Sequence, residues 1–452
     1  MKKICIMGLG YIGLPTAIVA AEHGFDVVGF DIDTQRVQRI NNFDPVIDEP
    51  EVYERLQPLL TSQQFRATAT LEQADCFVIA VPTPFKDEKK ADLSYVMAAT
   101  KAVATVLKKD DVVIIESTIP VGTTQQCAQL LEQETGMKAG HDFFVAHCPE
   151  RVLPGKIFFE LLYNARIIGG INQLSMNKAK VFYKQFVKAS LYLTNATTAE
   201  MVKLVENSSR DVAIAFANQV ASMAYAVGLN PFEVIELANK HPRVNLLNPS
   251  CGVGGHCIAV DPWFLVETFP EQSHLIKTAR KVNDEKPHQV VACVRSWVNE
   301  WKKNHDKNPT ILALGLTYKA DVNDLRESPA LEIAQHLIHE SNAELLVCEP
   351  HIKSHELSTQ FKERLVSLDE GIKRADIILC LVHHTQFKAI DQTVLTTKKI
   401  LDFCGLFYRS HQESDEQEKL FWPANSITSM SPFEPEITDQ YAINTTNKEY
   451  CS

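Results

Sequence analysis

Short apolar runs alternate with amphipathic stretches along the first part of the chain. Residues 3–7 form an apolar run typical of a buried strand, residues 8–13 a glycine-rich turn, and residues 15–23 a helix that ends before Gly24. Further apolar runs, which end in polar residues or proline, read as strands at 26–33, 74–85, 110–124 and 142–152. This order of elements predicts a doubly wound parallel sheet.

Residues 198–227 form a longer stretch that lacks proline and glycine and carries apolar residues at helical spacing. They predict one long helix that links two domains. Beyond this helix the α/β pattern returns, with a helix at 328–340 and strands at 310–316, 344–350, 375–384 and 398–405. The likeness between 74–85 and 375–387 suggests two nucleotide-fold domains related by distant repetition.

We therefore predict an α/β protein with two Rossmann-like doubly wound domains joined by a long central helix. The polar stretch after Ser410 has scattered prolines and no periodicity, so we expect a flexible tail there. The expected division is a first Rossmann-like domain at 1–196, a central helical dimerisation and linker domain at 197–300, a second Rossmann-like domain at 301–409 and the tail at 410–452.

Composition narrows the possible partners and the compartment. The chain has 452 residues, a net charge of -11 and a pI near 5.8, which argue against a nucleic-acid or anionic-membrane partner. The eleven cysteines are odd in number and scattered, several within apolar strands, which favours buried thiols in a reducing cytoplasm. The apolar N-terminus also resembles a signal peptide, but its glycines, Pro15 and the strand that follows argue against that alternative.

The first turn carries a dinucleotide fingerprint, Gly8-x-Gly10-x-x-Gly13, with Asp31 eighteen residues beyond the last glycine. Gly8 permits the tight turn, Gly10 lets the backbone approach a pyrophosphate, and Gly13 lets the helix pack on the strand. A carboxylate at Asp31 would accept the ribose hydroxyls and repel a 2'-phosphate. The fingerprint predicts NAD, although the neighbouring Arg36 leaves NADP open.

Three polar residues follow strands of the first domain and are expected at its ligand crevice. Thr83, Thr118 and Glu150 each come after an apolar run, and the carboxyl ends of parallel strands meet at one edge. Ordinary helix capping by threonine is the alternative for Thr83 and Thr118.

The long helix places Lys203, Asn207 and Arg210 on one face, at i, i+4 and i+7. A solvated polar stripe is the simpler explanation. The remainder of the helix is small and apolar, which indicates burial on several sides, with a dimer interface as one candidate. Because buried polar groups are costly, this burial favours a functional stripe.

A cysteine loop, "NPSCGVGGHCIAVDPWF" at 248–264, sets three glycines and His256 before Cys257. Glycines 252, 254 and 255 would let the main chain approach a bulky ligand and adopt left-handed geometry. A thiol beside His256 and near Lys203 could ionise and attack an aldehyde carbon. The alternatives are a structural cysteine and a zinc site of Cys251, His256 and Cys257, for which no CxxC pair is present.

The second domain lacks the glycine fingerprint after its first strand. Lys319 and Arg326 stand where the cofactor turn would be, so this half is expected to hold a different phosphate-bearing ligand.

Together these motifs resemble the UDP-glucose/GDP-mannose dehydrogenase family from residue 1 to about 409. The stretches that carry the resemblance are "GLGYIGLP", "VPTPF", "ESTIPVGTT", "CPERVLPG", "AEMVKLVENSSRDVAIAFANQ", "HPRVN", "GVGGHCIAVDPWF" and "GLTYKADVNDLRESPA". "CIAVDPWF" and "CPERVLPG" resemble the N-acetylhexosamine branch, so UDP-N-acetylmannosamine is the expected substrate; the glucosamine and galactosamine epimers stay open.

The resemblance implies a double oxidation in which the aldehyde is not released. The sugar C6 alcohol gives hydride to NAD, and Cys257 captures the resulting aldehyde as a thiohemiacetal. A second NAD takes hydride from the thiohemiacetal, which becomes a thioester. Water then hydrolyses the thioester to the uronate. It implies that Lys203 and Asn207 hold the oxyanion. Asp261 and Thr118 would position water and assist proton transfer, and Glu150 is a candidate base or water-orienting group in the thioester step.

The ligand-binding residues that we expect form two groups, and no metal ligands are expected. The cofactor group is Gly8, Gly10, Tyr11, Ile12, Gly13, Asp31, Arg36, Thr83, Thr118 and Thr124. The UDP-sugar group is Arg151, Val152, Lys203, Asn207, Arg210, His241, Arg243, Gly254, Tyr318, Lys319 and Arg326, with Arg243 a candidate to act across the interface of a homodimer.

One departure from the family pattern is "NPSCGVGG", which puts Cys251 six residues before Cys257. A disulfide between them under oxidation is a speculative alternative to a passive small residue.

Two functions from other classes also remain: a sugar oxidoreductase that uses one NAD, which has no use for Cys257, and a non-catalytic NAD sensor, which has no need of Lys203, Asn207 and Asp261.

Overall fold

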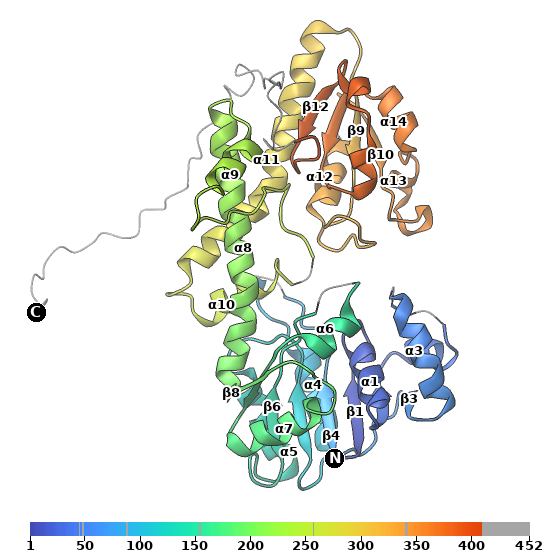
Figure 1. The fold of residues 1–452 in the computed structure, drawn as a ribbon, viewed down its shortest axis with the longest axis vertical. Coiled ribbons are helices and arrows are strands. Elements are labelled where there is room, and N and C mark those ends of the chain that lie inside the picture. Colours follow the sequence, from blue (N-terminus) through green and yellow to red (C-terminus); the bar gives the residue numbers. More distant parts are fainter. Residues whose placement is uncertain are drawn as a thin grey trace, which may run out of the picture.

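The computed structural model describes residues 1–44, 46–47, 49–86, 89–152, 155–255, 257–339 and 342–408. Two α/β lobes are joined by a pair of long helices, α8 and α11 (Figure 1). The predicted tail at 410–452 and His256 of the cysteine loop lie outside the described residues.

The first lobe is built on an eight-stranded sheet in the order β3-β2-β1-β4-β5-β6-β7-β8. All neighbouring strands are parallel except β6 and β7, which pair antiparallel. The strands are β1 (Lys3–Met7), β2 (Asp26–Phe30), β3 (Phe65–Thr68), β4 (Cys76–Ile79), β5 (Val112–Ile115), β6 (Phe144–His147), β7 (Arg166–Gly170) and β8 (Leu191–Asn195). The predicted strands are confirmed, whereas β3, β7 and β8 were not predicted.

Helices cover both faces of this sheet, which explains why its central strands read as continuous apolar runs. The helices are α1 (Gly13–Glu22), α2 (Thr34–Asn41), α3 (Pro50–Thr61), α4 (Ser94–Ala104), α5 (Thr123–Thr135), α6 (Ile157–Tyr163) and α7 (Gln173–Tyr183). Ile4 and Ile6 of β1 belong to the apolar cluster on one face, and Cys5 and Met7 to the cluster on the other.

The predicted long helix is α8 (Ala196–Ala226), and it packs along a second helix of equal length, α11 (His274–Asn304), which the sequence did not indicate. The buried Arg280 of α11 pairs with Asp211 of α8 at 2.5 Å, and Asn283 donates to Asp211. Two short helices, α9 (Pro231–Ala238) and α10 (Asp261–Thr268), also pack on α8. Polar pairs therefore fix how the two long helices lie together.

The second lobe contains a fully parallel four-stranded sheet in the order β10-β9-β11-β12. Its strands are β9 (Thr310–Leu314), β10 (Glu344–Cys348), β11 (Ile377–Cys380) and β12 (Lys399–Asp402). Its helices are α12 (Pro329–Ile338), α13 (Thr359–Lys362) and α14 (Leu368–Arg374), with short 3₁₀ turns at Ser354–Glu356, Thr385–Ala389 and Gln392–Leu395. The prediction of two Rossmann-like domains is confirmed.

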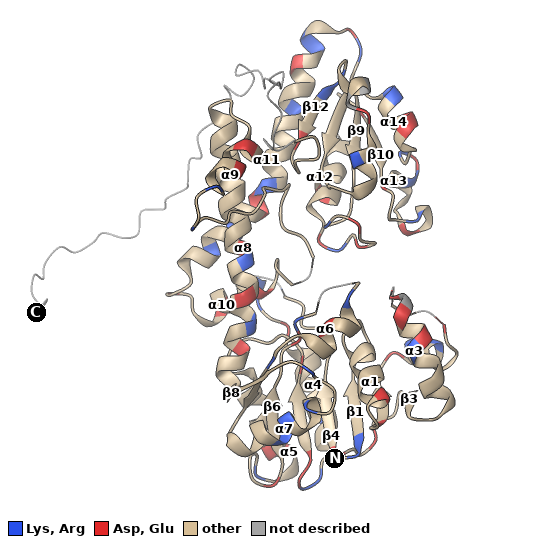
Figure 2. Cartoon of the chain, viewed as in Figure 1, with Lys and Arg blue, Asp and Glu red and all other residues tan. Residues whose placement is uncertain are grey.

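Charged side chains are spread over both lobes, with Lys and Arg interspersed among Asp and Glu (Figure 2). The strands of both sheets carry few of them, in keeping with their burial. None of the described helices combines the length and the apolar character needed to cross a bilayer.

Candidate active site

The three glycines of the first turn each meet a different environment. Gly8 has φ +92°, and a Cβ there would lie 2.7 Å from the Ala80 carbonyl oxygen. A Cβ on Gly13 would lie 1.8 Å from the Gly8 carbonyl oxygen, whereas one on Gly10 would meet no protein atom within 4 Å. The turn therefore needs Gly8 and Gly13 for its own packing and leaves open space at Gly10, where the N-terminus of α1 can receive a pyrophosphate.

Asp31 lies directly after β2, at the edge of the same turn. Its buried carboxylate accepts hydrogen bonds from the Leu9 amide at 2.8 Å and the Asp33 amide at 2.9 Å, and Arg36 approaches it at 3.0 Å. Since a carboxylate offers about four acceptor positions, one remains for a ribose hydroxyl. Tyr11 and Ile12, which directly precede α1, are partly exposed beside this turn.

Two of the predicted threonines meet at the carboxyl edge of the sheet. The Thr83 hydroxyl donates to the Thr118 carbonyl oxygen at 2.7 Å, so the loops after β4 and β5 are tied together. Thr124 behaves differently from our expectation. It is fully buried, and its amide and hydroxyl both donate to Glu200 at 2.6 Å. A fully buried side chain presents no group to a cofactor, and the Thr124 hydroxyl instead joins α5 to Glu200 of α8.

Glu200 is a residue that the sequence analysis missed. Its carboxylate, on α8, accepts from the amides of Gly122 and Thr124 at the first turn of α5. These amides are among the donors that a helix N-terminus leaves without an intrahelical partner. Glu200 thereby couples the central helix to the Thr118 loop. No local signal reveals it, because the partners are far apart in sequence.

The predicted catalytic residues Lys203, Asn207, Cys257 and Asp261 come together where α8 crosses the start of α10. The Asn207 side-chain amide donates to the Asp261 carboxylate at 2.5 Å, and the Asp261 amide donates to the Cys257 carbonyl at 2.8 Å. Lys203 is close enough for its charge to act on both Cys257 and Asp261. The face of α8 predicted from helical spacing is therefore part of a site.

Electrostatics in this cluster favour the neutral forms of two acids. Burial raises the pKa of Asp261 to about 6, which Lys203 and the Asn207 hydrogen bond partly oppose. The Cys257 thiol reaches solvent, yet desolvation and the Asp261 charge raise its pKa, against Lys203 and Arg326. The arrangement does not support our expectation of a readily ionised thiol, because desolvation is the largest influence on its pKa and Asp261 adds to it.

Glu150, which follows β6, is buried in an ion pair. Its carboxylate lies 2.8 Å from the Arg166 guanidinium of β7, and Arg166 also lies 3.7 Å from Glu116. Burial raises the pKa of Glu116, and its Tyr183 hydrogen bond and Arg166 oppose the rise. A carboxylate network thus extends from the edge of the sheet into its interior.

His147, at the end of β6, is a further residue that the sequence analysis did not single out. It is fully buried, and its Nδ1 lies 2.8 Å from the Ile115 carbonyl oxygen. Burial lowers the pKa of His147 to about 3, and the nearby Lys203 charge acts in the same direction. Its Nε2 has no hydrogen-bond partner among the described residues. A neutral imidazole acceptor therefore lies near Lys203.

The glycines of the cysteine loop pack against the second lobe. Gly255 has φ +77° and donates its amide to the Arg326 carbonyl, and a Cβ on Gly254 would lie 2.5 Å from the Glu327 carbonyl oxygen and 2.7 Å from Tyr318 Cβ. The left-handed geometry is confirmed at Gly255. At Gly254, however, the close approach is to protein rather than to a ligand, because the loop fills the seam between the lobes.

This packing brings the second lobe to the cysteine. Tyr318 and Arg326 both interact electrostatically with Cys257, and Arg326 holds Asp324 in a bidentate pair at 2.9 and 2.7 Å. Lys319, on the same loop, is exposed.

Other predicted substrate residues are spread more widely. Arg151 pairs with Glu206 of α8 at 2.6 Å, and Val152 packs against the first-lobe core. Arg210 is exposed on α8. His241 and Arg243 are exposed after α9, which lies at the end of α8 far from the first lobe, whereas α10 lies nearer that lobe (Figure 1). The segment that carries these two residues therefore starts from the end of α8 that is far from α10.

Cys251 is buried in the core of the second lobe, where its thiol lies 3.5 Å from the Leu381 carbonyl. Burial raises the pKa of this thiol to about 12. It is held away from solvent while Cys257 is exposed, so the speculative disulfide between them is not supported and Cys251 packs as a small residue.

The fold and the site define an NAD-dependent dehydrogenase in which a second nucleotide-binding type of lobe packs against a cysteine loop. The chain belongs to the UDP-glucose/GDP-mannose dehydrogenase family: residues 2–187 match its NAD binding domain, 197–285 its central domain and 312–408 its UDP binding domain. It is thus an NAD-dependent nucleotide-sugar dehydrogenase.

Similar proteins cover almost the whole family region. A UDP-N-acetyl-D-mannosamine dehydrogenase of Campylobacter jejuni is 45% identical over 413 residues, 89% of this chain and 99% of that protein. An NDP-N-acetyl-D-galactosaminuronic acid dehydrogenase of Ralstonia nicotianae is also 45% identical over 413 residues, 90% of this chain and 96% of that protein. A solved UDP-D-ManNAc dehydrogenase from Pyrococcus horikoshii is 40% identical with a TM-score of 0.82, covering 90% of this chain and 96% of that one.

Proposed function

We propose that the protein oxidises the C6 alcohol of UDP-N-acetyl-D-mannosamine to the carboxylate, with two NAD per sugar. The observation that supports this most strongly is the position of Cys257, between the Lys203–Asn207–Asp261 cluster and the Tyr318–Arg326 loop. A thiol held there can capture an aldehyde before it leaves, which an enzyme limited to one oxidation does not need.

The proton steps follow from the residues around the sulfur. NAD, when bound, accepts hydride in each of the two oxidations. Asp261, through a bound water, takes the proton of the C6 hydroxyl, releases it to solvent and later takes the proton of the Cys257 thiol. Lys203 and the Asn207 amide donate to the oxygen that becomes negative in the thiohemiacetal and again when water attacks the thioester. Burial lowers the pKa of His147, so this imidazole stays neutral and adds no second positive charge beside Lys203.

Binding of the nucleotide part is assigned to the second lobe. Tyr318, Lys319 and Arg326 lie on one loop after β9, and the two cations suit a diphosphate. Glu150 orients the hydrolytic water, and Thr118 holds it from the neighbouring loop.

We keep 1–196, 197–300 and 301–409 as the functional domains. The ten described cysteines are all free, which supports a reducing, cytoplasmic location.

A homodimer through α8 is part of the proposal. Met201, Val205, Phe216 and Met223 are exposed by 39–57% and recur on one face of this helix, which leaves an apolar stripe uncovered. A second copy packed on this stripe would bring the partner's 241–243 segment toward this chain's site. That arrangement gives His241 and Arg243 a role at the active site.

The test is the amount of NADH formed at completion by the purified protein with UDP-N-acetyl derivatives of mannosamine, glucosamine and galactosamine, and with UDP-glucose. Two NADH per sugar, with the mannosamine compound preferred, is the expected result. Preference for the galactosamine compound would reassign the sugar. One NADH per sugar would make Cys257 structural, and none with any sugar despite NAD binding would favour the sensor.

A further inference from the structure

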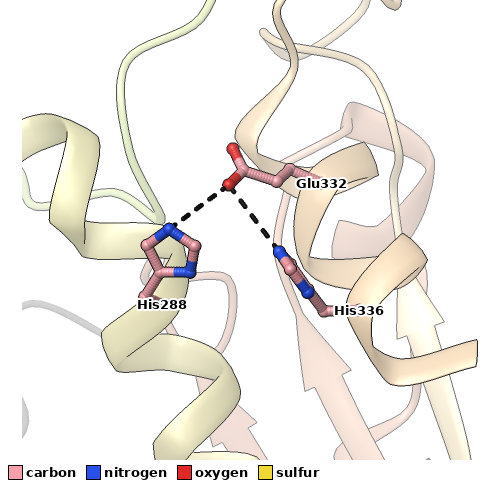
Figure 3. Close-up of side chains that lie close together, drawn as sticks. All are labelled: His288, Glu332 and His336. Carbon is pink, nitrogen blue, oxygen red and sulfur yellow. Dashed lines mark ion pairs between the residues drawn. The ribbon is translucent and has the colours of Figure 1, made fainter. Parts of the chain in front are cut away.

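Three metal-ligating side chains meet where α12 of the second lobe packs on α11. His288 lies on α11, and Glu332 and His336 lie on α12, with all three side chains pointing toward one another (Figure 3). The Glu332 carboxylate oxygen Oε1 is 3.9 Å from His288 Nε2 and 4.0 Å from His336 Nε2. The three ligand atoms lie within 4.8 Å of one another.

The backbone under this cluster is rigid. Glu332 and His336 are four residues apart on α12, so they share one face of the helix. Beneath them, Val290 and Val291 of α11 pack in the same apolar cluster as Ile333 and Ala334 of α12. The two helices are therefore held at a fixed separation by their buried residues, which pre-organises the three ligands at the rim of that contact.

The separations suit a small ion after minor side-chain rotation. In a tetrahedral site with metal–ligand bonds of about 2.1 Å, neighbouring ligand atoms lie about 3.4 Å apart. The observed distances exceed this by roughly half an ångström. All three side chains are partly exposed, so such rotations meet little resistance.

We propose that His288, Glu332 and His336 bind a divalent transition metal, with zinc as the best fit. Two imidazoles and one carboxylate are a ligand set that zinc accepts, with water in the fourth position. Glu332 also lines a cavity of about 410 Å³ together with Phe85 and Val253, so the ion has a path from solvent. The metal would join α11 to α12 at the seam where the lobes meet.

A second cluster in the second lobe, of Asp321, His351 and His384, is a poorer metal site. His384 accepts from the Asp321 amide at Nδ1, and its Nε2 contacts Thr317 and Glu349. Both ring nitrogens are already in use, so no lone pair of His384 is left for a metal. At His288 and His336 the nitrogen nearest Glu332 makes no shorter contact among the described residues.

The test uses untagged, chelator-treated protein carrying Cys257→Ser, because the exposed thiol would itself bind metal. Titration with Co²⁺ should give one equivalent of tetrahedral d–d absorption without thiolate charge transfer, and Zn²⁺ should displace it and raise the Tm. His288→Ala and Glu332→Gln should weaken binding at least about tenfold. The matched control His339→Ala removes an exposed histidine at the end of the same helix and should change nothing.

Equal weakening by His339→Ala, or binding that survives His288→Ala, would overturn the proposal, as would no binding at all. His336→Ala provides a second ligand variant if one substitution disturbs folding. Neither the NADH yield nor the sugar enters this experiment, so it can fail while the proposed function stands.

Discussion

The two lobes share one structural turn and use it differently. In the first lobe, Gly8 after β1 has φ +92° and the acid Asp31 after β2 accepts from the Leu9 amide at 2.8 Å. In the second lobe, Gly315 after β9 has φ +90° and the acid Glu349 after β10 accepts from the Leu316 amide at 2.6 Å. The two domains that the sequence suggested to be related by repetition therefore share the glycine turn and the hydrogen bond from its amide to an acid.

The difference begins two residues later. Counting from Gly315, the positions equivalent to Gly10 and Gly13 are Thr317 and Ala320. Thr317 is buried and contacts His384, which also holds Glu349 at 3.3 Å, whereas Asp31 faces the partly exposed Arg36. Both acids are buried, but Glu349 is paired with a buried histidine of its own lobe, whereas the partner of Asp31 is a partly exposed arginine. Side chains on the turn, not the sheet, decide which nucleotide a lobe can hold.

The largest effect is expected at the seam, where neither lobe acts alone. Cys257→Ser should lower kcat by about a thousandfold or more, because the serine hydroxyl is a far weaker nucleophile, while NAD and UDP binding persist. Steady-state rates and binding calorimetry with both nucleotides test this. Activity within a few fold of the parent enzyme would remove Cys257 from the chemistry.

Gly13→Ala and Ala320→Gly test the turns of the two lobes. The new Cβ at Gly13 would collide with the Gly8 carbonyl, so we expect at least about tenfold weaker NAD binding and a stability loss of about 1–3 kcal/mol. Ala320→Gly restores the third glycine of the fingerprint in the second lobe and should cost under about 1 kcal/mol without creating an NAD site. Denaturation curves measure the stability of both variants, and NAD titrations measure their affinity. A second equivalent of bound NAD in Ala320→Gly would contradict the view that the second lobe cannot bind NAD.

Asp31→Asn and Glu349→Gln should separate binding from stability. The first should weaken NAD about tenfold, because an amide cannot accept from both ribose and backbone as a carboxylate does. The second should leave NAD affinity intact and lower stability by about 1–3 kcal/mol, since His384 and three backbone amides lose a charged acceptor. Reversed outcomes would mean that the acids have exchanged roles.

The smallest effect is a difference in pH dependence. Burial raises the pKa of Glu116 in the first lobe, so its folded form holds a proton that the unfolded chain releases, and stability falls as pH rises above the usual carboxyl range. In the second lobe burial is outweighed by bonds from His384 and backbone amides, which lower the pKa of Glu349. Its contribution is present above the usual carboxyl pKa and is lost as pH falls through the folded value.

Urea unfolding from about pH 2.5 to 7.5 of the parent, Glu116→Gln and Glu349→Gln proteins should reveal these slopes. Glu116→Gln should flatten the loss of stability at higher pH, and Glu349→Gln the loss at lower pH. Identical slopes in all three would contradict the assignment.

Local patterns were enough to predict much of the site. The β1 strand, the glycine turn and α8 were predicted because strand and helix periods, and the need for glycine at a tight turn, are properties of neighbouring residues. The grouping of Lys203 and Asn207 followed from helix geometry, and the cysteine loop stood out by its glycines. Such signals report which face of an element is buried.

They do not report what buries it, and that was decided by the tertiary structure. Several features join residues that are far apart in the chain. They are the antiparallel pairing of β7, the packing of the long α11, the contact of Glu200 with the first turn of α5, and the pairing of Arg151 with Glu206. The raised pKa of Cys257 arises in the same way, since Asp261 and desolvation come from packing. His288, Glu332 and His336 become a cluster only because α12 packs on α11. Sequence alone determined the local elements and their chemistry; contacts between them depend on long-range packing, which no short window of sequence contains.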